Sequence, residues 1–119
     1  MPLSGLNALT RLPLGNWRDD PDLFALADAS LRETIVVGLA EGVGLPPDSA
    51  DRTLAGIRSM PAYHMTSMGT DLLRGHRLEL PWFAGKVVEL GRRHGIPTPA
   101  NGFIHTALKL YANGAPERT

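Results

Sequence analysis

Polar residues between positions 64 and 71 have types and spacings that could carry chemistry. His64, Ser67 and Asp71 are three and four residues apart, so a helix would place all three side chains on one face. These are the residue types of a serine-hydrolase triad, but a triad also needs an exposed nucleophile with an oxyanion hole, usually from an elbow or a helix start. Positions in the middle of a helix do not supply one, so polar residues facing a cleft or solvent explain the pattern better.

A carboxylate just before a proline is a second candidate. Glu79 lies in the segment GHRLELP at 75–81, between two expected helices. Its charge would lie near the positive end of the helix that begins at Pro81, which favours an ionised carboxylate. On physical grounds alone, both an exposed charge near a helix N-terminus and a site residue fit Glu79.

Two further patterns, one of glycines and one of histidines, do not fit a cofactor site or a metal site. Gly42-Val43-Gly44 resembles the start of a dinucleotide fingerprint, which needs a strand before it and a helix N-terminus after it. Here a helix is expected before it, the residues LPP follow and the third glycine is missing, so a helix C-cap explains it better. The four histidines, at positions 64, 76, 94 and 105, form neither HExxH nor an i,i+4 pair, so we expect no metal site.

Six helical segments, separated by glycine and proline, are expected to position these residues. The second is the clearest, because Asp20 can cap it, Pro21 fits its first position and apolar residues recur at spacings of three and four until Gly42. The other five are expected at about 3–12, between the Pro46-Pro47 pair and position 61, at 62–74, at 81–95, and at 99–114 after a Thr98 cap. Short connections between such helices predict an all-α helical bundle of about six helices.

Length and composition limit the class of protein. With 119 residues, 43% hydrophobic and 20% charged, the chain fits one globular domain at 1–114 and a frayed tail at 115–119. Twelve basic residues balance twelve acidic ones, so no charge excess favours nucleic acid or an anionic membrane as partner. The absence of cysteine excludes disulfides and thiolate metal sites. No membrane-length apolar run and no signal-peptide pattern is present, so a cytoplasmic location is expected.

Several stretches, taken in order, resemble the C-terminal domain of ketopantoate reductases (2-dehydropantoate 2-reductases). These stretches are SMGTD at 67–71, GHRLEL at 75–80, GKVVELG at 85–91 and HGIPTPAN at 94–101. The family pattern there includes Ser-Met-x-x-Asp, Gly-Arg-x-Thr-Glu and Gly-Ile-x-x-Pro-x-Asn. NALT at 7–10 is similar to the Asn-Pro-Leu-Thr of the family's first C-terminal helix. The resemblance implies the helical fold seen in the C-terminal domain of 6-phosphogluconate dehydrogenase.

The resemblance also implies roles for three residues. The family reduces ketopantoate, a 2-keto acid, to pantoate with NADPH on the route to pantothenate, and its N-terminal Rossmann domain holds the nucleotide. By this resemblance Ser67 would hydrogen-bond the substrate carboxylate, and Asn7 would help to hold the polar end of the substrate. Glu79 would lie at the cleft and orient substrate, cofactor ribose or the catalytic lysine. Neutral donors can fix a carboxylate while hydride arrives at the neighbouring carbonyl.

This sequence departs from the family pattern in ways that bear on activity. The family's proton-donating lysine falls before Met1, its earlier asparagine falls on Leu3, and Leu78 stands where threonine is usual. The resemblance therefore implies that this chain alone binds no NADPH and reduces no substrate. The expected partners are a Rossmann domain, in the same or a separate chain, and a small 2-keto acid.

Self-association is a further expectation, because separation from the Rossmann half would expose an interface of roughly 600–1,500 Å². Two alternative functions stay open. The chain could be a non-enzymatic helical dimerisation or interaction module, or it could be one subunit of a split reductase.

Overall fold

The structure is a computed structural model that describes residues 6, 10, 12–64 and 84–111. Every regular element in this part of the chain is a helix. These helices are α2 (Leu14–Arg18), α3 (Pro21–Ala40), α4 (Ser49–Ser59), α6 (Ala84–His94) and α7 (Pro99–Leu108), followed by the 3₁₀ turn η2 (Lys109–Tyr111). Leu6 and Thr10 are also helical, and the Thr10 hydroxyl donates a hydrogen bond to the Leu6 carbonyl at 2.8 Å. The predicted all-α class is confirmed.

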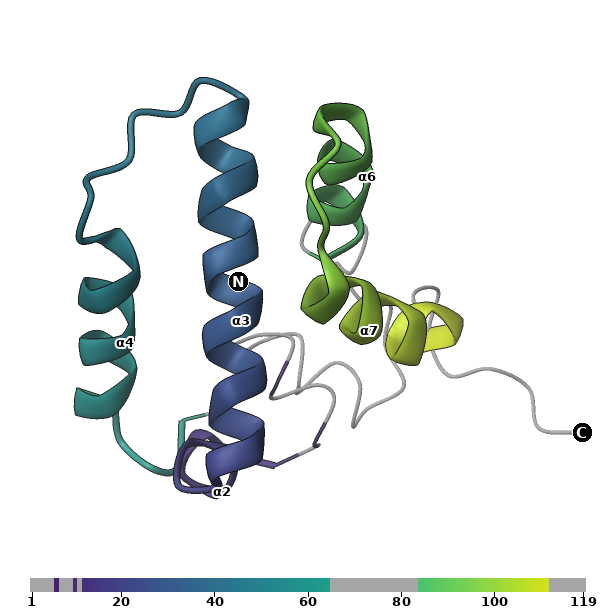
Figure 1. Ribbon diagram of the computed structural model, residues 1–119. Coiled ribbons are helices and arrows are strands. Elements are labelled where there is room, and N and C mark those ends of the chain that lie inside the picture. The colour runs from purple at the N-terminus through teal and green to yellow at the C-terminus, as the bar shows by residue number, and fades with distance from the viewer. Residues whose placement is uncertain (1–5, 7–9, 11, 65–83, 112–119) are drawn as a thin grey trace, which may run out of the picture.

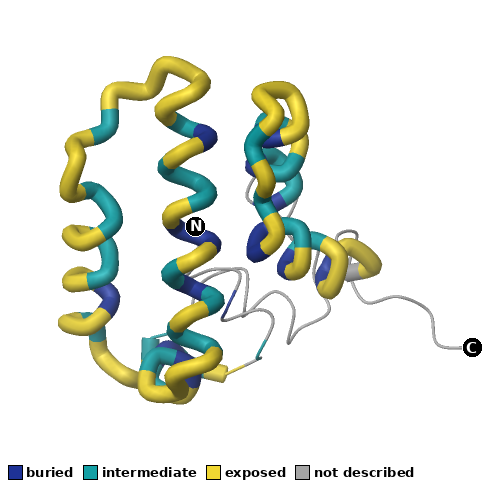
Figure 2. The backbone as a smooth tube through the Cα atoms, in the orientation of Figure 1, coloured by how far each residue is buried: buried dark blue, intermediate teal, exposed yellow. Residues whose placement is uncertain are grey.

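α3 is the central helix of the described structure. It is 20 residues long, about 30 Å, and packs against α2, α4, α6 and α7. α4 lies on one side of it and the α6–α7 pair lies on the other (Figure 1). The buried positions of α3, α6 and α7 turn toward one another (Figure 2). No described helix is long and apolar enough to cross a lipid bilayer.

Local signals explain where α3 begins and ends. The Asp20 carboxylate accepts hydrogen bonds from the amides of Asp22 and Leu23, both at 3.0 Å, and Pro21 occupies the first helical position. At the other end Gly42 has a φ of +86°, the left-handed conformation that glycine adopts without a steric penalty. The predicted Asp20 cap and the C-cap interpretation of Gly42 are both confirmed.

The hydrophobic core joins α2, α3, α4, α6 and α7 to the N-terminal residues. Its buried members are Leu6, Leu14, Trp17, Ala27, Ile57, Ala84, Ile104 and Leu108. Trp17 is fully buried and is the largest of them. Because these side chains come from both ends of the chain, the core forms only when the two ends pack together.

Helix α2 lies in a stretch where the sequence pattern predicts no helix. Pro13 and Gly15 suggest a break, yet Pro13 takes the N-cap position, where its φ of −60° is compatible with a helix start. The two helical positions three residues apart, Leu14 and Trp17, are both fully buried. Burial of these two large side chains therefore offsets the weak helix signal.

Two predicted boundaries are also wrong. The third helix begins at Ser49 rather than at Pro46-Pro47, because the Pro46 carbonyl accepts the Ser49 amide and hydroxyl in a turn. The fourth predicted helix does not begin at position 62, since Ala62 and Tyr63 form a turn. The backbone of that turn bonds to α2 instead.

Candidate functional site

The site predicted from the sequence consists of three residues that all lie outside the described part of the chain: Asn7, Ser67 and Glu79. Their nearest described neighbours along the sequence are Leu6, His64 and Ala84, at one, three and five positions respectively. These neighbours show to which part of the fold each segment is attached.

The segment that leads to Ser67 is attached to the start of α2. The Leu14 amide donates to the His64 carbonyl and the Gly15 amide donates to the Ala62 carbonyl, each at 2.9 Å. A Cβ atom on Gly15 would lie 2.7 Å from the Ala62 Cβ, closer than real Cβ atoms approach, so this contact requires glycine at position 15. The start of α2 thus fixes the backbone three residues before Ser67.

The neighbours of the other two predicted residues share one hydrophobic cluster. Leu6 is fully buried and Ala84 is 5% exposed. Both belong to the core cluster that includes Ile104 and Leu108 of α7. Helix α7 therefore belongs to the same packed core as Leu6 and Ala84.

The buried polar residues of the described structure lie where α7 begins against α3. The Glu33 carboxylate accepts the Ala100 amide at 2.8 Å through Oε2, and through Oε1 it accepts the Asn101 amide at 3.0 Å and Asn101 Nδ2 at 2.9 Å. Asn101 Nδ2 also donates to the Ser30 carbonyl, and Ser30 Oγ donates to Asn101 Oδ1, both at 3.0 Å. Ser30 and Asn101 are 1% and 2% exposed, so water does not compete for these bonds.

This cluster caps α7 from a neighbouring helix. Thr98 holds the N-cap position as predicted, but its side chain makes no capping hydrogen bond, so the predicted Thr98 cap is wrong in its chemistry. Glu33 takes that role, because a carboxylate satisfies two amides at once and its charge complements the positive end of the helix dipole. No local sequence signal indicates this role, which becomes evident only from the structure: Glu33 lies three residues from Ser30 and four from Val37, both buried on α3, where a carboxylate needs partners.

The α3–α7 cluster orients helices and is not arranged for acid–base chemistry. Three N–H groups of residues 100 and 101 already donate to Glu33, so both of its oxygens face the start of α7 rather than a substrate. The Ser30 hydroxyl donates to an amide oxygen rather than to a base, so it is not an activated nucleophile. The geometry therefore indicates a structural role.

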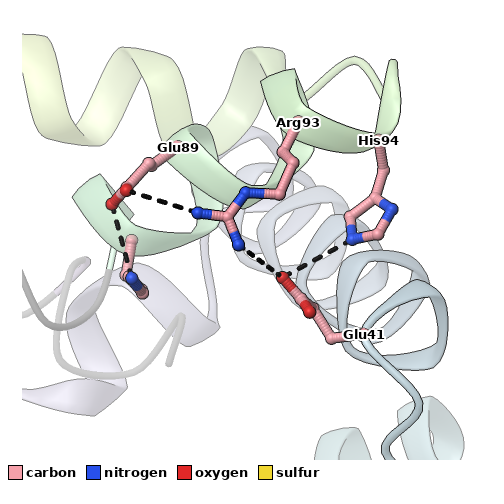
Figure 3. Close-up of polar contacts among 5 residues, drawn as sticks. Glu41, Glu89, Arg93 and His94 are labelled. Atoms are coloured by element: carbon pink, nitrogen blue, oxygen red, sulfur yellow. Dashed lines mark hydrogen bonds and ion pairs between the residues drawn. The ribbon is translucent and has the colours of Figure 1, made fainter.

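A second set of charges joins the C-terminal ends of α3 and α6 (Figure 3). Glu41 Oε1 lies 3.5 Å from His94 Nε2 and 3.8 Å from an Arg93 guanidinium nitrogen, while Glu89 pairs with Arg93 and Lys86 along α6. The side chains are 29–62% exposed, so each pair contributes at most about 1 kcal/mol. Within the described ranges no group of three or more carboxylates and histidines could hold a metal ion.

A shallow cleft of about 390 Å³ opens beside α2 and α4, lined by Arg18, Asp19, Phe24 and Arg58. Arg18 donates from one guanidinium nitrogen to the carbonyls of Ile57, Arg58 and Met60 at the end of α4, at 3.3, 3.4 and 2.7 Å. The Arg58 guanidinium stacks 5.1 Å from the centre of the Phe24 ring. Both cations are thus already engaged in joining helices.

The Gly42 segment does not fit a nucleotide phosphate site. Gly42 follows the last turn of α3 and ends it, with the Val43 amide bonded to the Gly38 carbonyl at 3.0 Å. A phosphate cradle needs glycines that lead into a helix N-terminus, with amides directed at the ligand. At Gly42 the chain leaves a helix, so its amides serve the helix end.

A family model described as "Ketopantoate reductase PanE/ApbA C terminal" matches residues 1–112. The chain belongs to this family. A 2-dehydropantoate 2-reductase of Caulobacter vibrioides is 34% identical over 107 residues, which cover 90% of this chain and 37% of the relative. One of Mesorhizobium japonicum is 34% identical over 113 residues, which cover 95% of this chain and 33% of the relative. The chain thus spans about a third of the length of these curated relatives.

Solved structures agree with this fold. A ketopantoate reductase from Ralstonia eutropha JMP134 has a TM-score of 0.81 at 32% identity, covering 91% of this chain and 36% of its own. A dimeric ketopantoate reductase from Staphylococcus aureus has a TM-score of 0.86 at 24% identity, covering 92% of this chain and 38% of its own. D-mandelate dehydrogenase shares the fold, with a TM-score of 0.77 at 19% identity, 92% of this chain and 61% of its own being covered. The ketopantoate reductase C-terminal fold expected from the sequence is confirmed.

Proposed function

We propose that this chain provides the substrate-side domain of a 2-dehydropantoate 2-reductase, which reduces ketopantoate to pantoate with NADPH. The observation that carries the proposal is the family match, which extends over residues 1–112 and includes all three predicted site residues. Curated relatives at 34% identity bear that enzyme name.

Each predicted site residue is assigned a task that suits its chemistry. The Ser67 hydroxyl donates to the substrate carboxylate, and the Asn7 amide holds the polar end of the substrate. Glu79 orients the substrate, the cofactor ribose or the catalytic lysine at the cleft. Fixing the substrate in one orientation lowers the barrier for hydride transfer to its carbonyl carbon. Burial of the flanking residues Leu6 and Ala84 in one core cluster supports a shared location for two of the three.

A nucleotide-binding domain, in the same polypeptide or in a separate chain, is the proposed holder of NADPH. The Gly42 segment ends a helix, so it supplies no phosphate cradle. We therefore expect the isolated 119-residue chain to show no reductase activity and no firm NADPH binding.

Association is proposed as a second property of this domain. Near the C-terminal end of α3, Val36, Leu39 and Val43 are 48–52% exposed, and apolar groups so placed favour contact with a partner. Sedimentation of the isolated chain is expected to show self-association as concentration rises. A monomer at high concentration would count against it, and a stable assembly without any reductase activity would favour the non-enzymatic interaction module.

Reconstitution tests the proposed reaction. The chain is combined with a Rossmann-fold half of a relative, and ketopantoate-dependent NADPH oxidation is followed. Ser67→Ala and Glu79→Ala should each lower kcat/KM by about tenfold or more, since a hydrogen bond to a charged group contributes roughly 1.5–3 kcal/mol. Matched controls are the exposed Ser59→Ala and Glu89→Ala, which should change kcat/KM less than twofold. If both site variants match the unmodified complex, the assignment is wrong.

A further inference from the structure

Glu33 connects two helices, α3 and α7, whereas a local helix cap bonds only to its own helix. Its carboxylate accepts three N–H groups from residues 100 and 101, so it holds the N-terminus of α7 against the middle of α3. Ser30, one helical turn earlier, is bonded to the same Asn101 side chain. α7 is therefore fixed to α3 by its first turn.

The position of α7 matters for the segments on either side of the proposed substrate site. Beyond its first turn, α7 places Ile104 and Leu108, three and seven residues after Asn101, in the cluster that contains Leu6 and Ala84. Leu6 directly precedes Asn7, and Ala84 begins the helix that follows the Glu79 segment. A rotation or shift of α7 would thus move the surface on which both flanking residues rest.

We propose that Glu33 is a positioning residue for the substrate site, acting through α7 on the segments that carry Asn7 and Glu79. This inference rests on the function proposed above. Glu33 is not assigned any contact with substrate. The role requires both carboxylate oxygens, because a neutral amide keeps one acceptor oxygen and would direct its NH₂ group at the donor of residue 100 or at the donors of residue 101.

A matched control lies on the same helix. Glu41 also reaches from α3 to its neighbour, but it pairs with the partly exposed Arg93 and His94 at the far end of α6. Glu33→Gln and Glu41→Gln remove the same charge from α3. The proposal predicts different consequences for the two variants.

Hydrogen–deuterium exchange of the 119-residue chain tests whether Glu33 stabilises these segments, and it needs no enzyme assay. At a temperature where each variant remains folded, Glu33→Gln should speed exchange at least tenfold in peptides 99–108, 1–12 and 75–90. Exchange in all peptides of Glu41→Gln should change less than threefold. An increase confined to 99–108, or an increase of the same size in every peptide of Glu33→Gln, would overturn the proposal.

A milder variant covers the case in which Glu33→Gln does not fold. Ser30→Ala removes one hydrogen bond to Asn101 and leaves the Glu33 cap in place. It should produce the same three-segment pattern with a smaller increase, about threefold. An increase of the same size in every peptide would again contradict the proposal.

Kinetics of the reconstituted enzyme test the functional part. Glu33→Gln should raise KM for ketopantoate at least tenfold and raise KM for NADPH less, because the Rossmann half holds the nucleotide and Glu79 is the one residue of the displaced segments with an assigned role at its ribose. Equal losses for both substrates, in proportion to the fraction of unfolded protein, would show a merely structural role. If the unmodified complex oxidises no NADPH with ketopantoate, the proposed reaction fails, whereas the exchange result still decides the role of Glu33.

Discussion

Glu33 in α3 and Asn101 in the first turn of α7 are joined by two hydrogen bonds, at 2.9 and 3.0 Å, across 68 residues of sequence. One carboxylate oxygen accepts both the backbone amide and the side-chain amide of the asparagine. The same carboxylate accepts the Ala100 amide. The start of one helix is therefore specified by another helix rather than by the residues that precede it.

Removal of the Asn101 side chain should lower the free energy of unfolding. Asn101→Ala leaves the Ser30 hydroxyl and one Glu33 oxygen short of a partner in a buried place, so we expect a loss of about 2–3 kcal/mol in the free energy of unfolding. Urea unfolding followed by circular dichroism measures it. The exposed Asn16→Ala is the control and should change stability by less than about 0.5 kcal/mol. Equal effects of the two variants would contradict this account.

Two glycines should respond to the same substitution with opposite signs. Gly15→Ala would place a Cβ 2.7 Å from the Ala62 Cβ and is expected to destabilise the fold by about 1–3 kcal/mol. Gly56→Ala in α4 meets nothing within 4 Å and is expected to stabilise it by about 0.5–1 kcal/mol. Thermal unfolding of both variants measures these changes in stability. A Gly15→Ala variant as stable as the unmodified chain would show that α2 does not approach residue 62 so closely.

The two aspartates at the N-caps of α3 and α4 should differ as well. Asp20→Ala removes a side chain that accepts two amides and should cost about 1 kcal/mol. Asp48 makes no capping bond and pairs with the exposed Arg52, so Asp48→Ala should cost no more than about 0.5 kcal/mol. Denaturant midpoints at constant m-value provide the comparison. The reverse order would refute the assigned cap.

Arg18 should contribute more to the stability of the fold than its position next to a surface cleft suggests. Arg18→Met keeps the aliphatic stem but removes the donor to three carbonyls at the end of α4, for an expected loss of about 1.5–3 kcal/mol. Arg52→Met breaks an exposed ion pair and should cost at most about 0.5 kcal/mol. Unfolding free energies of the pair test this. If Arg18→Met also loses no more than 0.5 kcal/mol, the joint between α2 and α4 is held by apolar packing instead.

Local signals allowed the sequence to predict some elements well. The Asp20-Pro21 start and the Gly42 end of α3 depend on neighbouring residues, so they could be read without any structure. Helix α2 could not, because Pro13 and Gly15 suggest a break and the burial of Trp17 that offsets it involves residues distant in sequence.

Long-range contacts account for what the sequence did not reveal. Thr98 has the residue type and position of a cap, yet the cap comes from Glu33, 65 residues earlier, whose partners no local pattern indicates. The family resemblance, which depends on the order of several motifs, identified the fold and is confirmed by the match over residues 1–112. The assignments of Asn7, Ser67 and Glu79 come from that resemblance and stay predictions.

The rate of ketopantoate-dependent NADPH oxidation by a Rossmann-fold half, with and without this chain, tests the central proposal most directly. If the chain supplies the substrate-side wall, its addition should raise the rate at least a hundredfold over either part alone, and the Ser67→Ala chain should recover less than a tenth of that gain. An unchanged rate in a mixture shown by sedimentation to form a complex would contradict the proposal.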